Sequence, residues 1–401
     1  MKWAPKMVAF DQAFEDQTSG QIKIQRGDYL PGGLLPVIDQ GQKPIAGYSD
    51  NLDHAYQGPL PVILFGDHTL SLKHVNFSFA LGADGVRVLA SRPPFLSKFL
   101  YYYLTSLNIK SHGYSRHFKY LREIKFPQIA ESEQSRIVEL LEQADRLRQQ
   151  RAEADQMADH ILPVLFHKMF GDSGTNSKKW IKKTLGSAGA LVRYGLGQPP
   201  QTSDSGLPLI RATNIHRGLI TSENMIYVKW EDVPESRNAF LKADEVIVVR
   251  SGAYTGDIAQ VTEAWEGSVA GYDLVVSPGA NFTGEFLECY MLTATVQQNY
   301  FGNIKARAGQ PHLNAEQVLN TPILLPPKTL QEKFSVFVKS LRNLRLQRNE
   351  SALLLNKLFA NMLHRAFTCE LTAKWREAHM KELIAEMERQ ARLLNATGKT
   401  N

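Results

Sequence analysis

The stretch QSRIVELLEQADRLRQQR at residues 134–151 has a second version at residues 331–348, which reads QEKFSVFVKSLRNLRLQR. The two align without a gap over residues 131–170 and 328–367, with eight identical positions. Leu147-Arg148 matches Leu344-Arg345, and Arg151 matches Arg348. Similarity at a fixed interval predicts that the chain contains an internal repeat.

Both copies of this stretch have apolar residues at heptad spacing, which predicts two long helices with a coiled-coil seam. The core positions that we predict are Ile137, Leu140, Leu147, Arg151 and Ile161 in the first helix, and Phe334, Phe337, Leu344, Arg348 and Leu358 in the second. Pro163 is expected to kink or split the first helix, and Gly171 to cap its end. Two unrelated amphipathic helices, each packed in a core, are the alternative interpretation.

The charges of the two helices favour pairing. Residues 131–170 carry five basic and eight acidic side chains, whereas residues 328–369 carry eight basic and two acidic side chains. Short strand patterns with turn signals precede each helix, so we expect a mixed α/β (α+β) fold in which a globular domain and a long helix occur twice. The expected segments are the first globular domain (1–130), the first long helix (131–172), the second globular domain (173–327), the second long helix (328–370) and a tail helix (371–401).

Composition narrows the function classes. The 401 residues include 43% hydrophobic and 21% charged residues, as in soluble globular proteins, and the net charge of +6 permits a nucleic-acid partner. No apolar run reaches the length of a membrane span, and the N-terminus does not resemble a signal peptide, so we expect a cytoplasmic protein. Two cysteines allow neither a disulfide framework nor a zinc cluster, and we expect no metal. The phosphate-loop, dinucleotide, metalloprotease and nucleophile-elbow motifs are all missing, which disfavours an enzyme.

Polar loops between the predicted strands are the candidate binding residues, because Arg, Lys, Asn and Gln can pair with base edges while Ser, Thr and backbone N–H groups hold phosphates. The candidates in the second half are Arg211, Asn214, Arg217, Arg250, Gly252, Tyr254, Thr255, Arg307, Gln310 and His312, and those in the first half are Lys73, His74, Ser115, Arg116, His117 and Lys119. Each loop alone is better explained by ordinary turn polarity. Their occurrence in both halves predicts a DNA-binding protein.

Five segments together resemble a known family. They are LPVLFHKMFGDSGTNSKKW (162–180), GQPPQTSDSGLPLIRATNIHRG (197–218), VIVVRSGAYTGDIAQV (246–261), HLNAEQVLNTPILLPPKTLQEKF (312–334) and HRAFTCELTAKWRE (364–377). As a set they are similar to the specificity (S) subunits of type I restriction-modification systems. Cys369 departs from the pattern, because the family usually has Gly at this helix cap.

The resemblance implies two target-recognition domains held apart by two long antiparallel coiled-coil helices with pseudo-twofold symmetry. Each domain would bind half of a bipartite double-stranded DNA target, and the helices would set the spacer. Two methyltransferase subunits would methylate adenine N6 with S-adenosylmethionine, and restriction/translocase subunits would use ATP and Mg²⁺. The chain itself would be non-catalytic and bind no cofactor.

Other interpretations stay open at this point. The chain could be the recognition subunit of another methylation-based defence system, or a coiled-coil scaffold that does not bind DNA. An enzyme that acts alone would show methyl transfer or cleavage without partners. The amphipathic tail, with Leu383, Met387 and Leu394 near one face, could pack on its own helix bundle or on a methyltransferase subunit.

Overall fold

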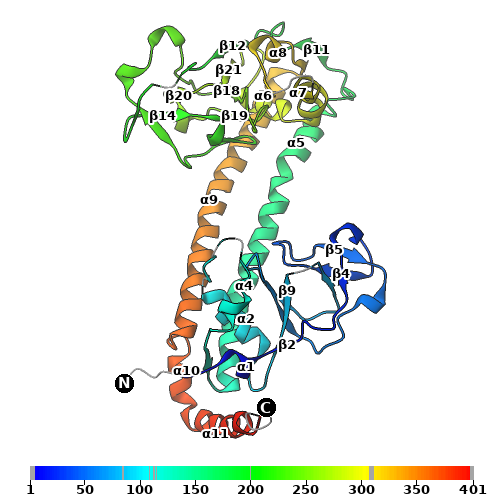
Figure 1. Cartoon of the computed structure of the whole chain (residues 1–401). Coiled ribbons are helices and arrows are strands. Elements are labelled where there is room, and N and C mark those ends of the chain that lie inside the picture. The colour runs from blue at the N-terminus through cyan, green and yellow to red at the C-terminus, as the bar shows by residue number, and fades with distance from the viewer. Residues whose placement is uncertain are drawn as a thin grey trace. The chain divides into compact units, whose positions relative to one another are not determined.

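The computed structural model describes residues 5–397, except residues 84, 108, 112, 114, 199 and 307–310. The chain divides into two compact units. Unit 1 comprises Met1–Ala152 and Glu350–Asn401, and unit 2 comprises Glu153–Asn349. The division falls within both long helices, so each unit contains one globular domain and one end of each helix (Figure 1).

Unit 1 contains a four-stranded antiparallel sheet in the order β2-β9-β6-β7, a second small sheet in the order β3-β8-β4-β5, and the β1–β10 pair. The strands are β1 Lys6–Val8, β2 Phe14–Asp16, β3 Lys23–Ile24, β4 Leu35–Ile38, β5 Gly47–Ser49, β6 Val62–Gly66, β7 Leu72–Val75, β8 Ala80–Gly82, β9 Val86–Ser91 and β10 Phe126–Gln128. The helices are α1 Phe10–Ala13, α2 Ser97–Ser106, α3 Phe118–Leu121, the first part of α4 Glu131–Asp159, the last part of α9 Lys328–Phe367, α10 Ala373–Ala378 and α11 Met380–Thr397.

Unit 2 repeats this plan, with a sheet in the order β12-β21-β18-β19, a second sheet in the order β13-β17-β14-β20, and the β11–β22 and β15–β16 pairs. Its strands are β11 Ile181–Thr184, β12 Leu191–Tyr194, β13 Thr202–Ser203, β14 Leu207–Ile210, β15 Ile215–His216, β16 Leu219–Ile220, β17 Ile226–Val228, β18 Val246–Val248, β19 Ile258–Gln260, β20 Val269–Ala270, β21 Leu274–Ser277 and β22 Pro322–Leu325. Its helices, besides the ends of α4 and α9, are α5 Ile161–Phe170, α6 Gly284–Met291, α7 Gly302–Ala306 and α8 Ala315–Leu319. The prediction of a mixed α/β domain and a long helix, each occurring twice, is therefore confirmed.

The identical residues Gln134 and Gln331 have the same structural role in the two units. Gln134 is fully buried; its amide donates to the carbonyls of Pro94 and Ile129 at 3.1 and 3.0 Å, and its oxygen accepts from Leu96 N at 2.9 Å. Gln331 is also fully buried and makes the corresponding three bonds in unit 2, to the carbonyls of Asn281 and Pro326 at 2.9 and 3.0 Å and from Thr283 N at 3.1 Å. Each glutamine fixes the start of a long helix to the start of a shorter one, α4 to α2 in unit 1 and α9 to α6 in unit 2.

The two long helices pack against each other within each unit. In unit 1, Arg148 of α4 donates to Asn356 of α9 at 2.9 Å and lies over the Phe359 ring at 4.3 Å. In unit 2, Arg348 of α9 donates to the Asp155 carboxylate at 2.6 Å. Arg348 also donates to the Asp155 carbonyl at 3.0 Å. The predicted Arg348 thus faces the first helix and holds it, whereas Arg151 lies partly buried on α4.

The predicted heptad seam is correct only in part. Ile137 and Phe334 are buried and Leu140 is partly buried. Five other predicted core positions are 46–54% exposed, namely Leu147, Ile161, Phe337, Leu344 and Leu358. The residues buried instead include Leu141, Val338 and Phe359, each one position away from a predicted one. The reason is that the ends of α4 and α9 pack on the domain cores as well as on each other, so the buried face follows the 3.6-residue helix and not a strict 3.5-residue seam.

The ends of the helices follow the sequence signals. The first helix breaks at His160, and α5 begins at Ile161 with Pro163 in its first turn, where the missing N–H of proline costs little. Gly171 ends α5 with a φ of +79°. Cys369 follows α9 with a φ of +65°, a left-handed conformation that favours glycine.

The tail packs on the start of α4 within unit 1. Glu386 of α11 accepts bonds from the backbone N–H and the hydroxyl of Ser132 at 3.0 and 2.6 Å. Arg376 of α10 makes a buried ion pair of 2.7 Å with Glu133, and Leu383 is buried. The tail therefore encloses the start of α4 inside unit 1. Among the described helices, none is both long enough and apolar enough to cross a membrane.

Candidate nucleic-acid interface

The β18–β19 hairpin of unit 2 has a polar loop with an exposed tip. Val249 N donates to the carbonyl of Asp257 at 2.8 Å and closes the loop, which runs from Arg250 to Gly256. Gly252 has a φ of +89°, and a Cβ on it would meet only open space. Its backbone can therefore approach a ligand more closely than a loop covered by side chains.

Arg250 is held at the base of this hairpin by aromatic rings. Its guanidinium lies 4.9 Å from the Tyr194 ring centre and 4.2 Å from that of Tyr272, and one terminal nitrogen is 3.0 Å from His312 Nε2. Tyr194 and Tyr272 are 41% and 47% exposed. Contact with two aromatic rings and His312 restrains the guanidinium, and such preorganisation favours bidentate recognition of a planar acceptor.

Asp273 lies directly behind this cluster. Its carboxylate accepts the Arg250 backbone N–H at 3.1 Å, and the residue is 2% exposed. Burial raises the pKa of Asp273 to about 6, although the amide and the charge of Arg250 act in the opposite direction. The buried carboxyl thus positions the backbone of Arg250, whereas the Arg250 guanidinium contacts the two tyrosine rings and His312.

Further cationic side chains surround the hairpin. Arg217 is exposed, and Lys305 donates to the Thr255 carbonyl at 3.1 Å. Burial raises the pKa of Asp257, opposed by the positive charges of Arg217, His216 and Lys305. Tyr254 is 43% exposed and packs edge-on against His216 at 5.6 Å. Positive charge beside exposed aromatic rings is the combination that binds phosphates and stacks on bases.

Two predicted contact residues of unit 2 stabilise loops instead. Asn214 is fully buried, and its amide donates to the carbonyls of Thr221 and Glu223 at 3.3 and 2.9 Å. Thr255 is 7% exposed and donates to the Gly252 carbonyl at 2.7 Å. The prediction of direct contact is wrong for both, because their hydrogen-bonding groups are used inside the loop. Arg211 is partly buried and donates to the Asn224 carbonyl at 2.6 Å, and Arg307 and Gln310 lie outside the described residues.

The corresponding hairpin of unit 1, β6–β7, has different chemistry. Asp67 occupies the position after β6, and its carboxylate accepts the Phe118 N–H at 2.8 Å and lies 3.8 Å from Arg87 Nε. His117 is fully buried, with Nδ1 2.9 Å from the Asp67 carbonyl, so the prediction that it contacts a ligand is wrong. Arg116 and Lys119 are exposed and Ser115 is partly exposed. Arg116 lines a polar cavity of about 450 Å³ together with Lys23, His68 and Arg87.

Lys73 and His74, both on β7, are also structural. Lys73 donates to the carbonyls of Asp39 and Lys43 at 2.8 and 2.6 Å. The His74 ring lies 5.8 Å from that of Tyr101, and burial, with a smaller contribution from Lys98, lowers the pKa of His74 to about 4. Both were predicted as contact residues, and both are instead occupied in holding the hairpin to neighbouring elements.

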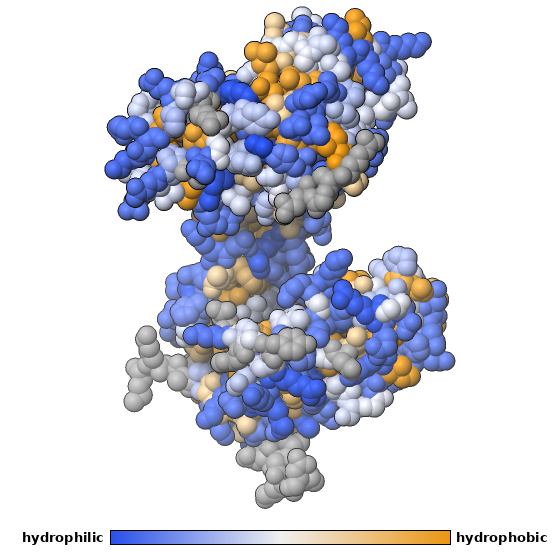
Figure 2. Space-filling model, turned by 45° about the horizontal axis from the view of Figure 1, so that its top comes forward, coloured by the Kyte–Doolittle hydropathy of each residue, from blue (hydrophilic) through white to orange (hydrophobic). Residues whose placement is uncertain are grey.

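Tyr194 and Tyr272 are the functional candidates that the sequence did not reveal. They stand 78 residues apart and share no motif. The antiparallel register of β12 and β21, which pairs Tyr194 with Leu274, brings them together around Arg250. Figure 2 shows that the visible faces of both units are largely hydrophilic, with small apolar patches. Within the described residues, no group of three or more His, Cys, Asp or Glu side chains could hold a metal ion.

Comparison with known proteins gives consistent relatives, although no protein-family model matches the chain. The EcoR124I/EcoR124II specificity subunit of Escherichia coli is 27% identical over 261 residues, which cover 59% of this chain and 62% of that protein. The EcoKI specificity subunit of Escherichia coli strain K12 is 22% identical over 211 residues, covering 51% and 45%. The chain resembles the specificity subunits of type I restriction enzymes. It spans about half the length of the curated relatives that it matches.

Solved structures of specificity subunits share the fold over almost the whole chain. The S subunit of a type I restriction-modification system from M. genitalium aligns with a TM-score of 0.59 at 15% identity, covering 91% of this chain and 99% of that one. A chain from a structural study of complex assembly in the type I R-M system aligns with a TM-score of 0.52 at 14% identity, covering 92% and 98%. This chain thus shares its duplicated fold with these structures.

Proposed function

We propose that this chain is the sequence-specific DNA-binding subunit of a type I restriction-modification complex. Each unit binds one half of a bipartite duplex target. In unit 2 the β18–β19 hairpin enters the major groove, with the Arg250 guanidinium, held between Tyr194 and Tyr272, as the group that reads a base edge. An arginine restrained in this way suits the two acceptors of guanine.

The observation that carries the proposal is the duplicated hairpin. The same sheet order occurs in both units, and each hairpin stands beside exposed cationic side chains, Arg217 in unit 2 and Arg116 in unit 1. The residues at the hairpin base differ, Asp67 in one unit and Arg250 in the other. Two similar domains whose hairpins differ at this position fit a target with two unlike half-sites.

The chemistry belongs to partner subunits in this proposal. Two methyltransferase subunits bind S-adenosylmethionine and methylate adenine N6, and restriction/translocase subunits bind ATP and Mg²⁺ and cleave unmethylated DNA. This chain acts in the cytoplasm by positioning them and binds none of these cofactors. The long helices determine the length of the non-specific spacer between the half-sites.

Reconstitution with a type I methyltransferase subunit from the same organism tests the proposal. The expected result is adenine-N6 methylation of plasmid DNA at a bipartite sequence by the mixture, and none by either protein alone. Methyl transfer or cleavage by this chain alone would show an enzyme instead. A mixture that methylates without sequence preference would contradict a specificity subunit, and absence of any DNA binding would favour a scaffold.

A further inference from the structure

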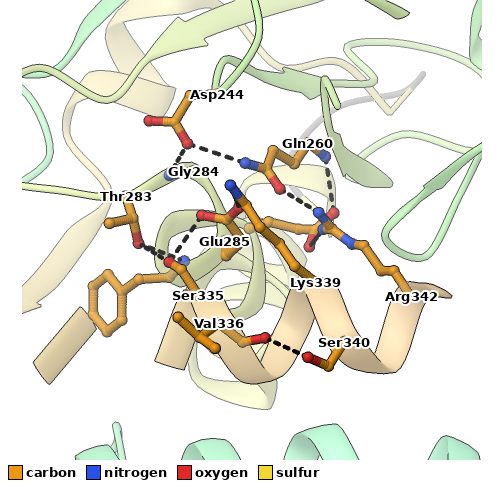
Figure 3. A network of polar contacts seen from close by, with 12 residues as sticks. Asp244, Gln260, Thr283, Gly284, Glu285, Ser335, Val336, Lys339, Ser340 and Arg342 are labelled. Carbon is orange, nitrogen blue, oxygen red and sulfur yellow. Dashed lines mark hydrogen bonds and ion pairs between the residues drawn. The ribbon is translucent and has the colours of Figure 1, made fainter. Parts of the chain in front are cut away.

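A buried polar cluster joins the reading hairpin of unit 2 to the long helix α9 (Figure 3). Arg342 of α9 donates one terminal nitrogen to the Gln260 side-chain oxygen and the other to the Glu288 carboxylate of α6. The second Glu288 oxygen accepts the Gln260 backbone N–H at 2.8 Å. Gln260, the last residue of β19, is therefore held through both its side chain and its backbone.

The same cluster holds the other end of the hairpin. Gln260 donates to the Asp244 carboxylate at 3.0 Å, and Asp244 also accepts the Gly284 N–H at 2.7 Å. Asp244 lies two residues before β18, and its backbone N–H donates to the Val261 carbonyl at 2.9 Å. Both ends of the hairpin are consequently fixed to α6 and α9, and only the loop that carries Arg250 extends away.

Unit 1 has a cluster at the equivalent place, with different residues. The Gln134 and Gln331 contacts align Tyr101 with Glu288 and Asp145 with Arg342, and the hairpin registers align His74 with Gln260. There the centre of the His74 ring lies 5.8 Å from that of Tyr101. Burial raises the pKa of Tyr101, and the negative charge of Asp145 raises it further. The Asp145 carboxylate pairs within its own helix with Arg148 at 3.1 Å. At these equivalent positions unit 2 has a direct guanidinium contact between the long helix and the hairpin, whereas in unit 1 the acidic residue of the long helix pairs within its own helix.

We propose that Arg342 is a positioning residue, which holds the β18–β19 hairpin in its reading orientation through Gln260 and Glu288. The inference rests on the proposed function, because it assigns to the long helix control over how one half-site is read. Any displacement of α9 in this region must move Gln260 or break its bond, since the guanidinium is shared between hairpin and α6. A subunit that binds α9 could therefore alter the half-site preference of unit 2 without touching DNA.

The test uses the full chain and a matched pair of variants. Arg342→Lys keeps a positive charge beside the buried Glu288 but has one donor group where arginine had two. Arg348→Lys makes the same change six residues further along α9, at the ion pair with Asp155, away from the hairpin. Hydrogen exchange of the residue 249–258 amides should accelerate roughly tenfold or more in Arg342→Lys, the factor expected when a bond to a charged group is lost, and stay unchanged in Arg348→Lys.

Selection from a random duplex DNA library gives the second readout. Arg342→Lys should weaken the sequence preference of one half-site while the other half-site and the spacer stay as in the wild type. Gln260→Ala, which removes the acceptor and keeps the ion pair, should give the same pattern and provides the test if Arg342→Lys does not fold.

Equal exchange rates in the hairpins of the Arg342→Lys and Arg348→Lys variants would overturn the inference. So would equal weakening of both half-sites. If the wild-type chain selects no duplex sequence at all, the proposed function fails, and the exchange experiment still decides whether Arg342 positions the hairpin.

Discussion

The buried ion pair between Glu133 and Arg376 gives the sharpest stability prediction. Glu133 at the start of α4 is 2% exposed, and Arg376 in the tail is 6% exposed. The guanidinium contacts both carboxylate oxygens at 2.7–3.1 Å, and Thr372 donates to one of them at 2.6 Å. In Arg376→Ala the carboxylate stays buried with only the threonine as its partner.

Removal of one member of a buried pair costs about 3–5 kcal/mol, because the other charge loses its compensation. A unit of about 200 residues changes its melting temperature by roughly 2–4 °C for each kcal/mol, so the expected decrease is about 6–20 °C. Differential scanning calorimetry measures it. The double variant Glu133→Leu/Arg376→Met is the control, since an apolar pair of similar volume should restore most of the loss.

An Arg376→Ala variant that melts within about 1 °C of the wild type would refute this reasoning, because an uncompensated buried carboxylate cannot cost so little. A double variant as unstable as the single one would show that packing of the tail, and not charge, dominates. The first result would remove the argument that this ion pair ties the tail to unit 1, and the second would replace its electrostatic explanation with packing.

Three further predictions follow from the buried polar groups and the helices. Gln331→Ala should destabilise unit 2 by about 2–3 kcal/mol, and Gln134→Ala should destabilise unit 1 by the same amount, because each change leaves buried backbone groups without a hydrogen-bond partner. Denaturant unfolding monitored by hydrogen exchange would show which unit loses stability. The pKa of Asp273 is raised to about 6 in the folded chain, so the folded state binds the proton more tightly than the unfolded state does. The free energy of unfolding should therefore fall by at most about 3 kcal/mol as the pH rises from about 4 to about 6. Asp273→Asn should abolish this slope, which unfolding measured at several pH values would show. Insertion of four residues, about one turn, beside Arg348 should lengthen the tolerated DNA spacer and leave both half-site sequences intact, which methylome sequencing would detect; an unchanged spacer with altered half-sites would contradict the spacer role.

Local sequence patterns were sufficient for the long-range organisation. The repeat predicted the duplicated domain, and the proline and glycine signals predicted the break at His160 and the cap at Gly171. These features depend on backbone chemistry and on the first residues of each helix, such as Gln134 and Gln331. They can be predicted without knowing which surfaces pack against each other. The phase of the seam did need it. Leu147 and Leu344 have the right spacing and are exposed, because the domain cores decide which face of each helix is buried.

The site was less predictable for the same reason. A polar residue in a loop looks alike in the sequence whether it faces solvent or its own backbone, so Asn214, Thr255 and His117 were assigned to contacts that burial excludes. Tyr194 and Tyr272 were missed because strand pairing alone brings them to Arg250. Arg250 was predicted as a candidate because it stands with two glycines in a turn between strand patterns, and its role in binding stays a prediction.

The methylome of cells that express this chain with its methyltransferase partner tests the central claim most directly. We predict a bipartite adenine-methylated motif for the wild type, and for Arg250→Ala a motif that is degenerate at one or two positions of a single half-site, which corresponds to about 1–3 kcal/mol of lost discrimination. A continuous motif, or an Arg250→Ala variant with both half-sites altered, would contradict the assignment of one half-site to each unit.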